Sequence, residues 1–409
     1  MLTRFRPTLA EIDLDAFARN LDAITSRLPP ASRLIAMMKA GAYGHGAVEL
    51  ARICEERGNV AMISVALVEE AVELRAAGIT LPILIVGPVT APQIPIILRE
   101  RFVLGVSGPE VLASLAAAGG EGSPGCTIHL ELDSGMGRMG LVDGDLSAAA
   151  GLLRENRWID VGAIYTHFAN ASDPDDPVTF QQIEVFRRML RRLRELGVEA
   201  PLHHLANSAA VMRDIVTPGD WARTGIALYG AEALDRESSR LEPVMTWRTE
   251  IARLKEVPAG SGIGYGLTYH TRRTSRIATL PVGYADGYDR RLSNQGVVLL
   301  HGRRAPVVGR VSMDLVTIDV TEIELAAAGD PVVLLGRQGN EQITADEIAA
   351  KIGTISYEIL CGVSARVPRL YRKGSDLRVV SKFNEIMDGS RDRSTESSPS
   401  SRPSRGAGT

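Results

Sequence analysis

Short apolar runs alternate with longer amphipathic segments between Leu9 and Tyr229, and this alternation constrains the fold more than any other feature. The apolar run LIAMM (34–38) precedes the amphipathic GHGAVELARICEERG, and MISVA (62–66) precedes LVEEAVELRAAG. Such a pattern indicates β-strand–α-helix units that build a parallel sheet. An open doubly wound sheet and a closed barrel both satisfy it, but about eight units in about 230 residues favour a (β/α)8 barrel.

The sequence changes character after Val244. Runs such as RIATLPVG and GRVSMDLVTIDV are rich in β-branched residues and turn glycines, which is typical of strands. One short helix is expected at TADEIAAKIG, where Thr344 and Glu347 have the spacing of a capping box. The segment from Asp388 to Thr409 is rich in Ser, Arg and Pro and is expected to be disordered. We therefore predict an α/β barrel domain (1–244), a mainly β C-terminal domain (245–387) and a tail (388–409).

The overall charge and the cysteine content narrow the class of protein. The chain has 46 Lys and Arg against 49 Asp and Glu, a net charge of −3, which gives no electrostatic reason to expect a nucleic-acid partner. Three scattered cysteines predict neither a disulfide framework nor a structural zinc site, and the histidines have no metal-ligand spacing. The sequence has no run long enough for a membrane helix and no secretory signal. We expect a cytoplasmic protein without a membrane or metal partner.

Polar or glycine-rich residues follow several of the predicted strands. In a barrel these positions meet at the C-terminal face, where the active sites of barrel enzymes lie. Each one alone is typical of a solvated turn, but together they suggest one pocket, formed by Lys39, Arg138, His167, Asn207, Ser208, Arg223, Gly225 and Ile226. A lysine at the base of a pocket suits Schiff-base chemistry, and glycine-rich turns can bind a phosphate. Lysine plus a phosphate cradle suggests pyridoxal 5'-phosphate (PLP) as cofactor.

The motifs that carry these residues resemble, in the same order, those of the alanine racemase family of PLP enzymes. The matching segments run from about Leu9 to Tyr371 and include MMKAGAYGHGAVELAR, LDSGMGRMG, YTHFANAS, HHLANSAA, RTGIALYG, GYGLTYH, GRVSMDLVTIDVT and ISYEILCGVSARVPRLY. The resemblance implies a PLP-binding barrel followed by a β-domain. It also implies interconversion of L- and D-alanine, which supplies D-alanine for peptidoglycan, by a homodimer with shared active sites.

The resemblance also implies which residues act in catalysis. Lys39 would bind the cofactor covalently and act as one acid/base, and Tyr265 of a second subunit would be the other. His167 would contact Tyr265 and Arg223, lowering the pKa of the tyrosine, since a phenol with a pKa of about 10 is a poor base at neutral pH. Arg223 would donate to the pyridine nitrogen of the cofactor. A guanidinium keeps its proton, so the ring stays a weak electron sink and proton return is favoured over decarboxylation.

Further contacts follow from the same resemblance. Cofactor contacts are implied at Tyr43, His204, Asn207, Ser208, Gly225, Ile226 and Tyr357. Arg138 and Met313 would lie at the substrate carboxylate. Tyr284 and Asp314 would line the access path, although a role in a subunit interface fits these two nearly as well.

One position departs from the family. Many members have a lysine, often carbamylated, where this sequence has Glu131, before DSGMGR. Glu131 supplies an anion directly, so we interpret it as a replacement that orients Arg138.

Alternative functions remain open at this point. A serine or broad-specificity racemase would share every motif. A non-catalytic PLP carrier should lack the β-domain and Tyr265, and a barrel decarboxylase should have an acidic residue in place of Arg223. The glycine-rich GSGIGYG (260–266) resembles a dinucleotide loop but does not lie in a βαβ unit.

Overall fold

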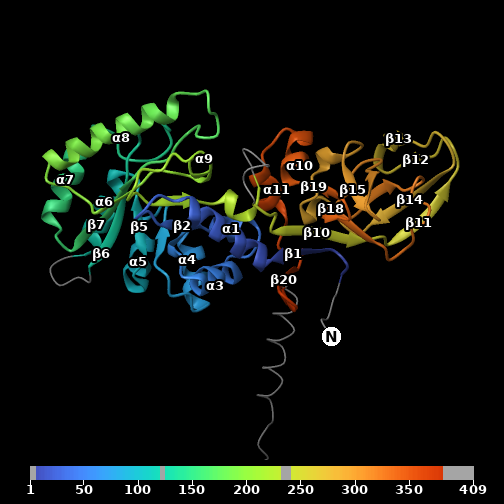
Figure 1. Ribbon diagram of the computed structural model, residues 1–409, viewed down its shortest axis with the longest axis horizontal. Coiled ribbons are helices and arrows are strands. Elements are labelled where there is room, and N and C mark those ends of the chain that lie inside the picture. Colours follow the sequence, from blue (N-terminus) through green and yellow to red (C-terminus); the bar gives the residue numbers. More distant parts are fainter. Residues whose placement is uncertain (1–5, 120–124, 232–240, 381–409) are drawn as a thin grey trace, which may run out of the picture.

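The structure is a computed structural model that describes residues 6–119, 125–231 and 241–380. The predicted tail (388–409) lies outside these residues. Figure 1 shows two bodies side by side, a barrel wrapped by helices and a mainly β half, with β1 and β10 running between them. No helix within the described ranges combines the length and the apolarity needed to cross a membrane.

Eight parallel strands form a nearly closed barrel, as the alternation of the sequence predicted. They are ordered β8-β7-β6-β5-β4-β3-β2-β9, and an isolated bridge between His204 and Trp221 joins the two ends. The strands are β2 (Leu34–Met37), β3 (Val60–Val65), β4 (Ile83–Ile85), β5 (Val103–Val106), β6 (Cys126–Glu131), β7 (Ile159–Tyr165), β8 (Leu202–His204) and β9 (Ala222–Thr224).

Side chains alternate along these strands between two apolar layers. Ile35, Met62, Leu84 and Val103 form a cluster of their own, while their neighbours along each strand pack against the helices. Because successive side chains of a strand point to opposite faces, the small cluster fills the barrel interior.

The helices cover the outside of the barrel (Figure 1). They are α1 (Leu14–Arg27), α3 (Ala47–Arg57), α4 (Val68–Ala76), α5 (Ile94–Glu100), α6 (Pro109–Ala118), α7 (Leu146–Glu155), α8 (Val178–Glu195) and α9 (Ser208–Met212). The short segment α2 (Lys39–Tyr43) instead lies just beyond the C-terminal end of β2. In α8, Phe186, Met189 and Leu193 follow helical spacing and are buried. Its arginines lie on the exposed face, and Arg187 and Arg192 form ion pairs with Glu184 and Glu195.

The C-terminal half is mainly β, as predicted. Its large sheet has the order β16-β15-β18-β10-β1-β20-β21, with β19 beside β18, and smaller sheets are β11-β14-β17 and β12-β13. The elements are β10 (Met245–Glu250), β11 (Arg253–Val257), β12 (Gly262–Ile263), β13 (Tyr269–His270), β14 (Ser275–Leu280), β15 (Val297–Leu300), β16 (Arg303–Pro306), β17 (Val316–Asp319), β18 (Pro331–Gln338), β19 (Glu341–Ile343), α10 (Ala345–Ile352), α11 (Ser356–Gly362), β20 (Arg369–Lys373) and β21 (Asp376–Val380). Thr344 caps α10 by accepting from the Glu347 amide at 3.1 Å, as its spacing predicted.

The first strand lies in an unexpected place. β1 (Leu9–Asp13) was part of the alternating pattern, yet it pairs antiparallel with β10 and parallel with β20 in the sheet of the C-terminal half. Asp13 then caps α1 by accepting from the Ala16 amide at 2.9 Å, and α1 packs on the barrel. The chain therefore begins in one half and crosses directly into the other.

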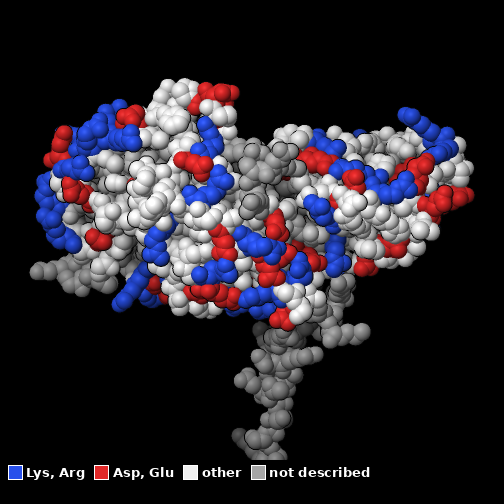
Figure 2. Space-filling view, in the orientation of Figure 1, with Lys and Arg blue, Asp and Glu red and all other residues white. Residues whose placement is uncertain are grey.

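Charged side chains are mixed in sign over most of the face shown in Figure 2, with arginines gathered over α8. This distribution agrees with the near-neutral net charge. The face shown therefore carries no broad field of one sign that would attract a polyanion.

Candidate active site

A cavity of about 160 Å³ lies at the C-terminal ends of the barrel strands. It contains most of the site residues expected from the sequence, and it is lined by Met37, Lys39, Tyr43, Val86, Glu131, Arg138, Tyr165, His167, Asn207, Ser208, Arg223, Gly225, Ile226 and Tyr357. Residues from separate βα junctions thus converge, as the barrel prediction required. Tyr357 comes from α11 in the other half, so both halves of the chain form this cavity.

The segment that carries Lys39 is a left-handed turn. Ala40, Gly41, Ala42 and Tyr43 all have positive φ, between 53° and 59°. Non-glycine residues in this conformation cost about 1–2 kcal/mol each, so the surroundings must hold the turn in place. Gly44 follows at φ 80°, where a Cβ atom would lie 2.3 Å from the carbonyl oxygen of Leu360. Only glycine allows this close approach between the turn and α11.

The surroundings of Lys39 favour a neutral amine. Burial lowers the pKa of Lys39, and the nearby charge of Arg138 lowers it further. Glu70, which lies on α4, has the opposite effect, because its negative charge raises the pKa of Lys39. One of its oxygens accepts from the Ala40 amide, and the other accepts from the amides of Ala66 and Leu67 at 2.9 and 3.1 Å. An amine with a lowered pKa is available as a nucleophile and as a base.

Arg223 is buried beneath the cavity, and protein groups engage its terminal nitrogens. Nη1 donates to Nδ1 and to the carbonyl oxygen of His204, both at 2.6 Å. Nη2 donates to the Thr166 carbonyl at 2.6 Å and to Nδ1 of His167 at 3.0 Å. Among the described residues, Nε–H has no such partner, which leaves this donor for a group bound in the cavity.

These contacts determine the tautomers of three histidines. Arginine can only donate, so Nδ1 of His204 and Nδ1 of His167 must both accept. The Nε2–H of His204 then donates to Nδ1 of His129 at 2.9 Å. Burial is the main cause of the lowered pKa in each case, and it brings the pKa of His167 to about 3. His167 is therefore neutral at physiological pH and presents its Nε2–H as a donor.

Glu131 is a buried carboxyl group, but its hydrogen-bond partner differs from the residue we expected. Tyr165 donates its hydroxyl to Glu131 Oε2 at 3.1 Å, and the described residues include no ion pair between Glu131 and Arg138. Burial raises the pKa of Glu131, whereas the positive charges of Arg223 and Arg138 lower it. Tyr165 also stacks on the ring of His204, with centroids 4.7 Å apart, and so links the Glu131 and Arg223 networks.

The cavity also has groups suited to a phosphate. Ser208 Oγ accepts from the amides of Gly225 and Ala227 at 3.0 and 3.4 Å. A Cβ atom on Gly225 would lie 2.3 Å from the Tyr43 hydroxyl, so glycine keeps this space open. The rings of Tyr43 and Tyr357 lie 5.9 Å apart. Hydroxyls and backbone amides of this kind bind phosphate, and together with Lys39 and Arg223 Nε they fit PLP.

The other expected site residues do not line this cavity. His204 lies behind Arg223 and contacts it directly. Tyr265, Met313 and Tyr284 belong to the C-terminal half and are 73%, 53% and 41% exposed. Asp314 is also exposed and forms a hydrogen bond with Arg366 at 2.7 Å.

Sequence reasoning missed three lining residues, Met37, Val86 and Tyr165. Tyr165 had a usable signal, because it ends β7 two residues before His167, and the strand ends of a barrel meet at the face of the active site. Met37 and Val86 are apolar residues at strand ends, which no chemical motif distinguishes.

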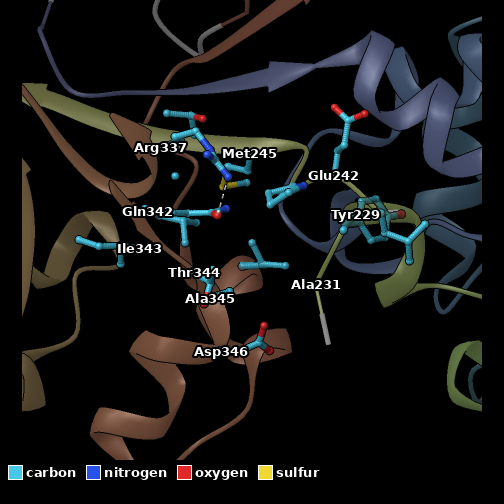
Figure 3. A pocket seen from close by; sticks show the side chains of 17 residues that line it. Tyr229, Ala231, Glu242, Met245, Arg337, Gln342, Ile343, Thr344, Ala345 and Asp346 are labelled. Carbon is cyan, nitrogen blue, oxygen red and sulfur yellow. Dashed lines mark hydrogen bonds between the residues drawn. The ribbon is translucent and has the colours of Figure 1, made fainter. Parts of the chain in front are cut away.

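A second, larger cavity of about 540 Å³ lies between the segment that follows β9 and the large β-sheet (Figure 3). Arg337 donates to Gln342 at 3.1 Å on one side of it. Figure 3 shows Asp346 and Glu242 on its other sides. It includes none of the expected site residues. Its lining flanks residues 232–240, which are outside the described ranges.

The fold and the first cavity together define a barrel enzyme with a lysine amine at its site. A model of the family described as alanine racemase, N-terminal domain, matches residues 12–233, and one described as alanine racemase, C-terminal domain, matches residues 244–371. The chain therefore belongs to the alanine racemase family.

Individual relatives agree with this assignment. Alanine racemases of Halothermothrix orenii and Methanococcus maripaludis are each 42% identical to the chain, covering 90% and 89% of it and 97% and 98% of their own lengths. A crystal structure of alanine racemase from Bacillus anthracis with bound L-Ala-P is 36% identical, with a TM-score of 0.88. The match covers 94% of this chain and 100% of that one.

Proposed function

We propose that the protein interconverts L- and D-alanine, with PLP bound at Lys39 and two bases on opposite faces of the substrate. The observation that carries the proposal is the convergence in one cavity of Lys39, the donor Nε–H of Arg223 and the phosphate-type groups around Ser208.

The residues around the cavity would hold the cofactor at both ends. Tyr43, Asn207, Ser208, Tyr357 and the amides of Gly225 and Ile226 would bind its phosphate, and Arg223 Nε–H would donate to its pyridine nitrogen, with His204 supporting Arg223 from behind. PLP supplies an electron sink that makes the α-proton of a bound amino acid removable. Because the guanidinium keeps its proton, the pyridine nitrogen stays unprotonated, which favours return of a proton over loss of carbon dioxide.

Racemisation requires removal of a proton from one face and its return on the other. We assign one face to the Lys39 amine, whose pKa burial lowers. We assign the other face to the partner subunit's Tyr265, because Tyr265 does not line the cavity of its own chain and is exposed. The Nε2–H of His167 would donate to that phenol oxygen and stabilise the phenolate, which makes tyrosine an effective base.

Residues at the mouth of the cavity would select and orient the substrate. We assign Arg138 and Met313 to the substrate carboxylate, Glu131 to the orientation of Arg138, and Tyr284 and Asp314 to the access path. The exposure of Tyr265, Tyr284 and Met313 supports a homodimer in which this surface is covered by a second chain.

Two further assignments complete the proposal. We place the boundary between the barrel and the β-domain at residue 244, where strand pairing changes from parallel to antiparallel. We also propose that the enzyme works in the cytoplasm, where D-alanine would feed peptidoglycan synthesis, and its three free cysteines suit a reducing compartment.

The range of substrates separates this proposal from its alternative, a serine or broad-specificity racemase. Circular dichroism of the purified protein with PLP would follow L-alanine, L-serine and L-arginine in parallel. We expect racemisation of alanine alone. Comparable rates with serine or arginine would replace the proposal with the broader activity.

The Lys39→Ala variant tests the site itself. Because a methyl group offers no amine, we expect loss of the visible absorption of covalently held PLP and loss of racemisation by at least about a thousandfold. Lys351→Ala, on the exposed side of α10, is the control. Retained absorption and activity in Lys39→Ala would reject the site.

A further inference from the structure

The left-handed turn that carries Lys39 is bonded to a strand of the other half of the molecule. Arg369 and Tyr371 lie two residues apart on β20, so their side chains share one face of the strand. Arg369 Nε and Nη2 donate to the Gly44 carbonyl at 3.0 and 2.7 Å. The Tyr371 hydroxyl donates to the carbonyl of His45 at 3.1 Å.

The same guanidinium is also bonded to the segment that directly follows α11. Nη2 donates to the Val363 carbonyl, and Nη1 donates to the carbonyls of Ser364 and Val367, each at 2.6 Å. All five N–H groups of Arg369 are therefore used on backbone carbonyls. Within the described ranges no carboxylate forms an ion pair with it. A partly buried cation without an anion lowers the free energy of unfolding. We therefore look for the role of Arg369 in the two segments that its hydrogen bonds join.

The connected segments are those that present the cavity's residues. The turn begins at Lys39 and ends at Tyr43, and α11 carries Tyr357. Close contacts leave little freedom between them, since a Cβ atom on Gly46 would lie 1.8 Å from the Tyr371 hydroxyl. His45 is fully buried, and its Nδ1–H donates to the carbonyls of Ala42 and Tyr43 at 3.0 and 2.9 Å, which closes the turn from within.

We propose that Arg369 and Tyr371 are positioning residues, which hold the strained turn and α11 together and thereby fix Lys39 and Tyr43 relative to Tyr357. The inference rests on the proposed role of Lys39 for its catalytic meaning. The turn's backbone is unfavourable by itself, and the described bonds from β20 compensate for it.

Hydrogen exchange of the turn, measured by mass spectrometry on the cofactor-free full chain, tests this directly. The variants are Arg369→Lys, which cannot make five directed bonds, and Tyr371→Phe, which keeps the ring and loses one bond. We expect exchange in residues 39–46 to be faster by about tenfold in Arg369→Lys and by less in Tyr371→Phe. Exchange in β6 should stay at the wild-type rate. Arg372→Lys is the matched control, because Arg372 forms ion pairs with Glu11 and Asp13 instead.

A second readout uses the loaded enzyme. We expect weaker PLP retention and a kcat lowered by about tenfold in Arg369→Lys, with a smaller change in KM for alanine, since a displaced Lys39 affects the chemical step most. Unchanged exchange in residues 39–46 in both variants would overturn the inference, as would equal acceleration in β6, which marks a general loss of stability. If Arg369→Lys does not fold, Tyr371→Phe decides alone. A wild-type protein without PLP binding or racemisation would reject the proposed function, while the exchange result would still decide whether β20 holds the turn.

Discussion

Glu131 lies where an anion can act through two different neighbours. Its oxygen accepts from Tyr165, and the charges of Arg223 and Arg138 both favour its ionised form. Glutamine at this position keeps an acceptor for Tyr165 but removes the charge. If Glu131 orients Arg138 electrostatically, Glu131→Gln should lower kcat/KM for alanine by about tenfold with Arg138 present and by much less in Arg138→Gln.

This double-mutant cycle separates the two neighbours. An equal effect of Glu131→Gln in both backgrounds would show that Glu131 acts through Tyr165 and not through Arg138. Asp160→Asn, at an exposed position of β7, provides a control for loss of an acidic group from the barrel.

Three buried histidines and the partly buried His167 make the free energy of unfolding depend on pH. Burial lowers the pKa of His45 and His129 to about 4 and that of His167 to about 3, and the pKa of His204 is also far below its usual value. The unfolded chain binds these protons near pH 6.5 and the native chain does not, so the free energy of unfolding falls as the pH drops below about 6.5. Between pH 7 and pH 5 the loss is about 2 kcal/mol for each histidine.

Urea unfolding at several pH values measures this slope. His129→Gln should lower the number of protons taken up on unfolding, which sets this slope, by about one. A slope that His129→Gln does not alter would contradict the assignment of His129 as a neutral buried residue.

At the residue scale, the sequence predicted what a local motif can encode. Lys39, His167 and Ser208 follow strands, and Arg223 lies in the short strand β9. Parallel strands of a barrel end on one face, so the convergence of these residues needed no contact information. Arg369 could not be found this way. Its partners are backbone carbonyls of residues up to 325 positions away, which carry no side-chain signature.

At the scale of elements, β1 is a second feature that depends on contacts distant in the sequence and that no local pattern predicts. Its composition and its position before a helix suit a barrel strand, yet it pairs with β10 and β20. Two β-strands of similar composition can exchange sheets without altering any local pattern, because the pairing partner is set by contacts distant in the sequence. The alternation of strands and helices was sufficient to predict the barrel. It did not predict the place of β1, the strand that joins the barrel to the C-terminal half.

The segment before β1 is held by a buried ion pair, which leads to a prediction about stability. Arg6 donates to both oxygens of Asp286 at 2.7 and 3.0 Å, and the Asp286 side chain is fully buried. Removing Arg6 takes two hydrogen bonds from a buried carboxylate and leaves it with Arg366, whose Nε lies 3.6 Å from Asp286 Oδ1, so Arg6→Ala should lower the free energy of unfolding by about 2 kcal/mol. Arg19→Ala breaks the Arg19–Glu242 pair, whose side chains are 53% and 49% exposed, and should cost less than about 1 kcal/mol.

Urea unfolding of the two variants compares the buried Arg6–Asp286 pair with the exposed Arg19–Glu242 pair within one protein. A cost for Arg6→Ala no larger than that for Arg19→Ala would show that the N-terminal segment does not contribute through Asp286. Because Asp286 ends the short helical turn Tyr284–Asp286, loss of Arg6 should also weaken substrate binding at the access path.

On the scale of the whole molecule, the proposed function requires a second chain to complete the active site. Tyr265 is 73% exposed and lies outside the cavity that contains Lys39. Lys39→Ala and Tyr265→Phe should each be inactive as homodimers. When the two are mixed and allowed to exchange subunits, half of the dimers pair one intact Lys39 with one intact Tyr265. We therefore expect recovery of about a quarter of the wild-type activity from the mixture.

Mixing the wild type with the double variant Lys39→Ala/Tyr265→Phe supplies the matching control. Shared sites predict that its activity falls on exchange from about a half to about a quarter of the wild-type value, because every mixed dimer then lacks one base at each site. Sites contained within one chain predict no recovery in the first mixture and no fall in the second. Since both mixtures contain the same four side chains in the same proportions, a difference between them on exchange can arise only from which chain supplies each base.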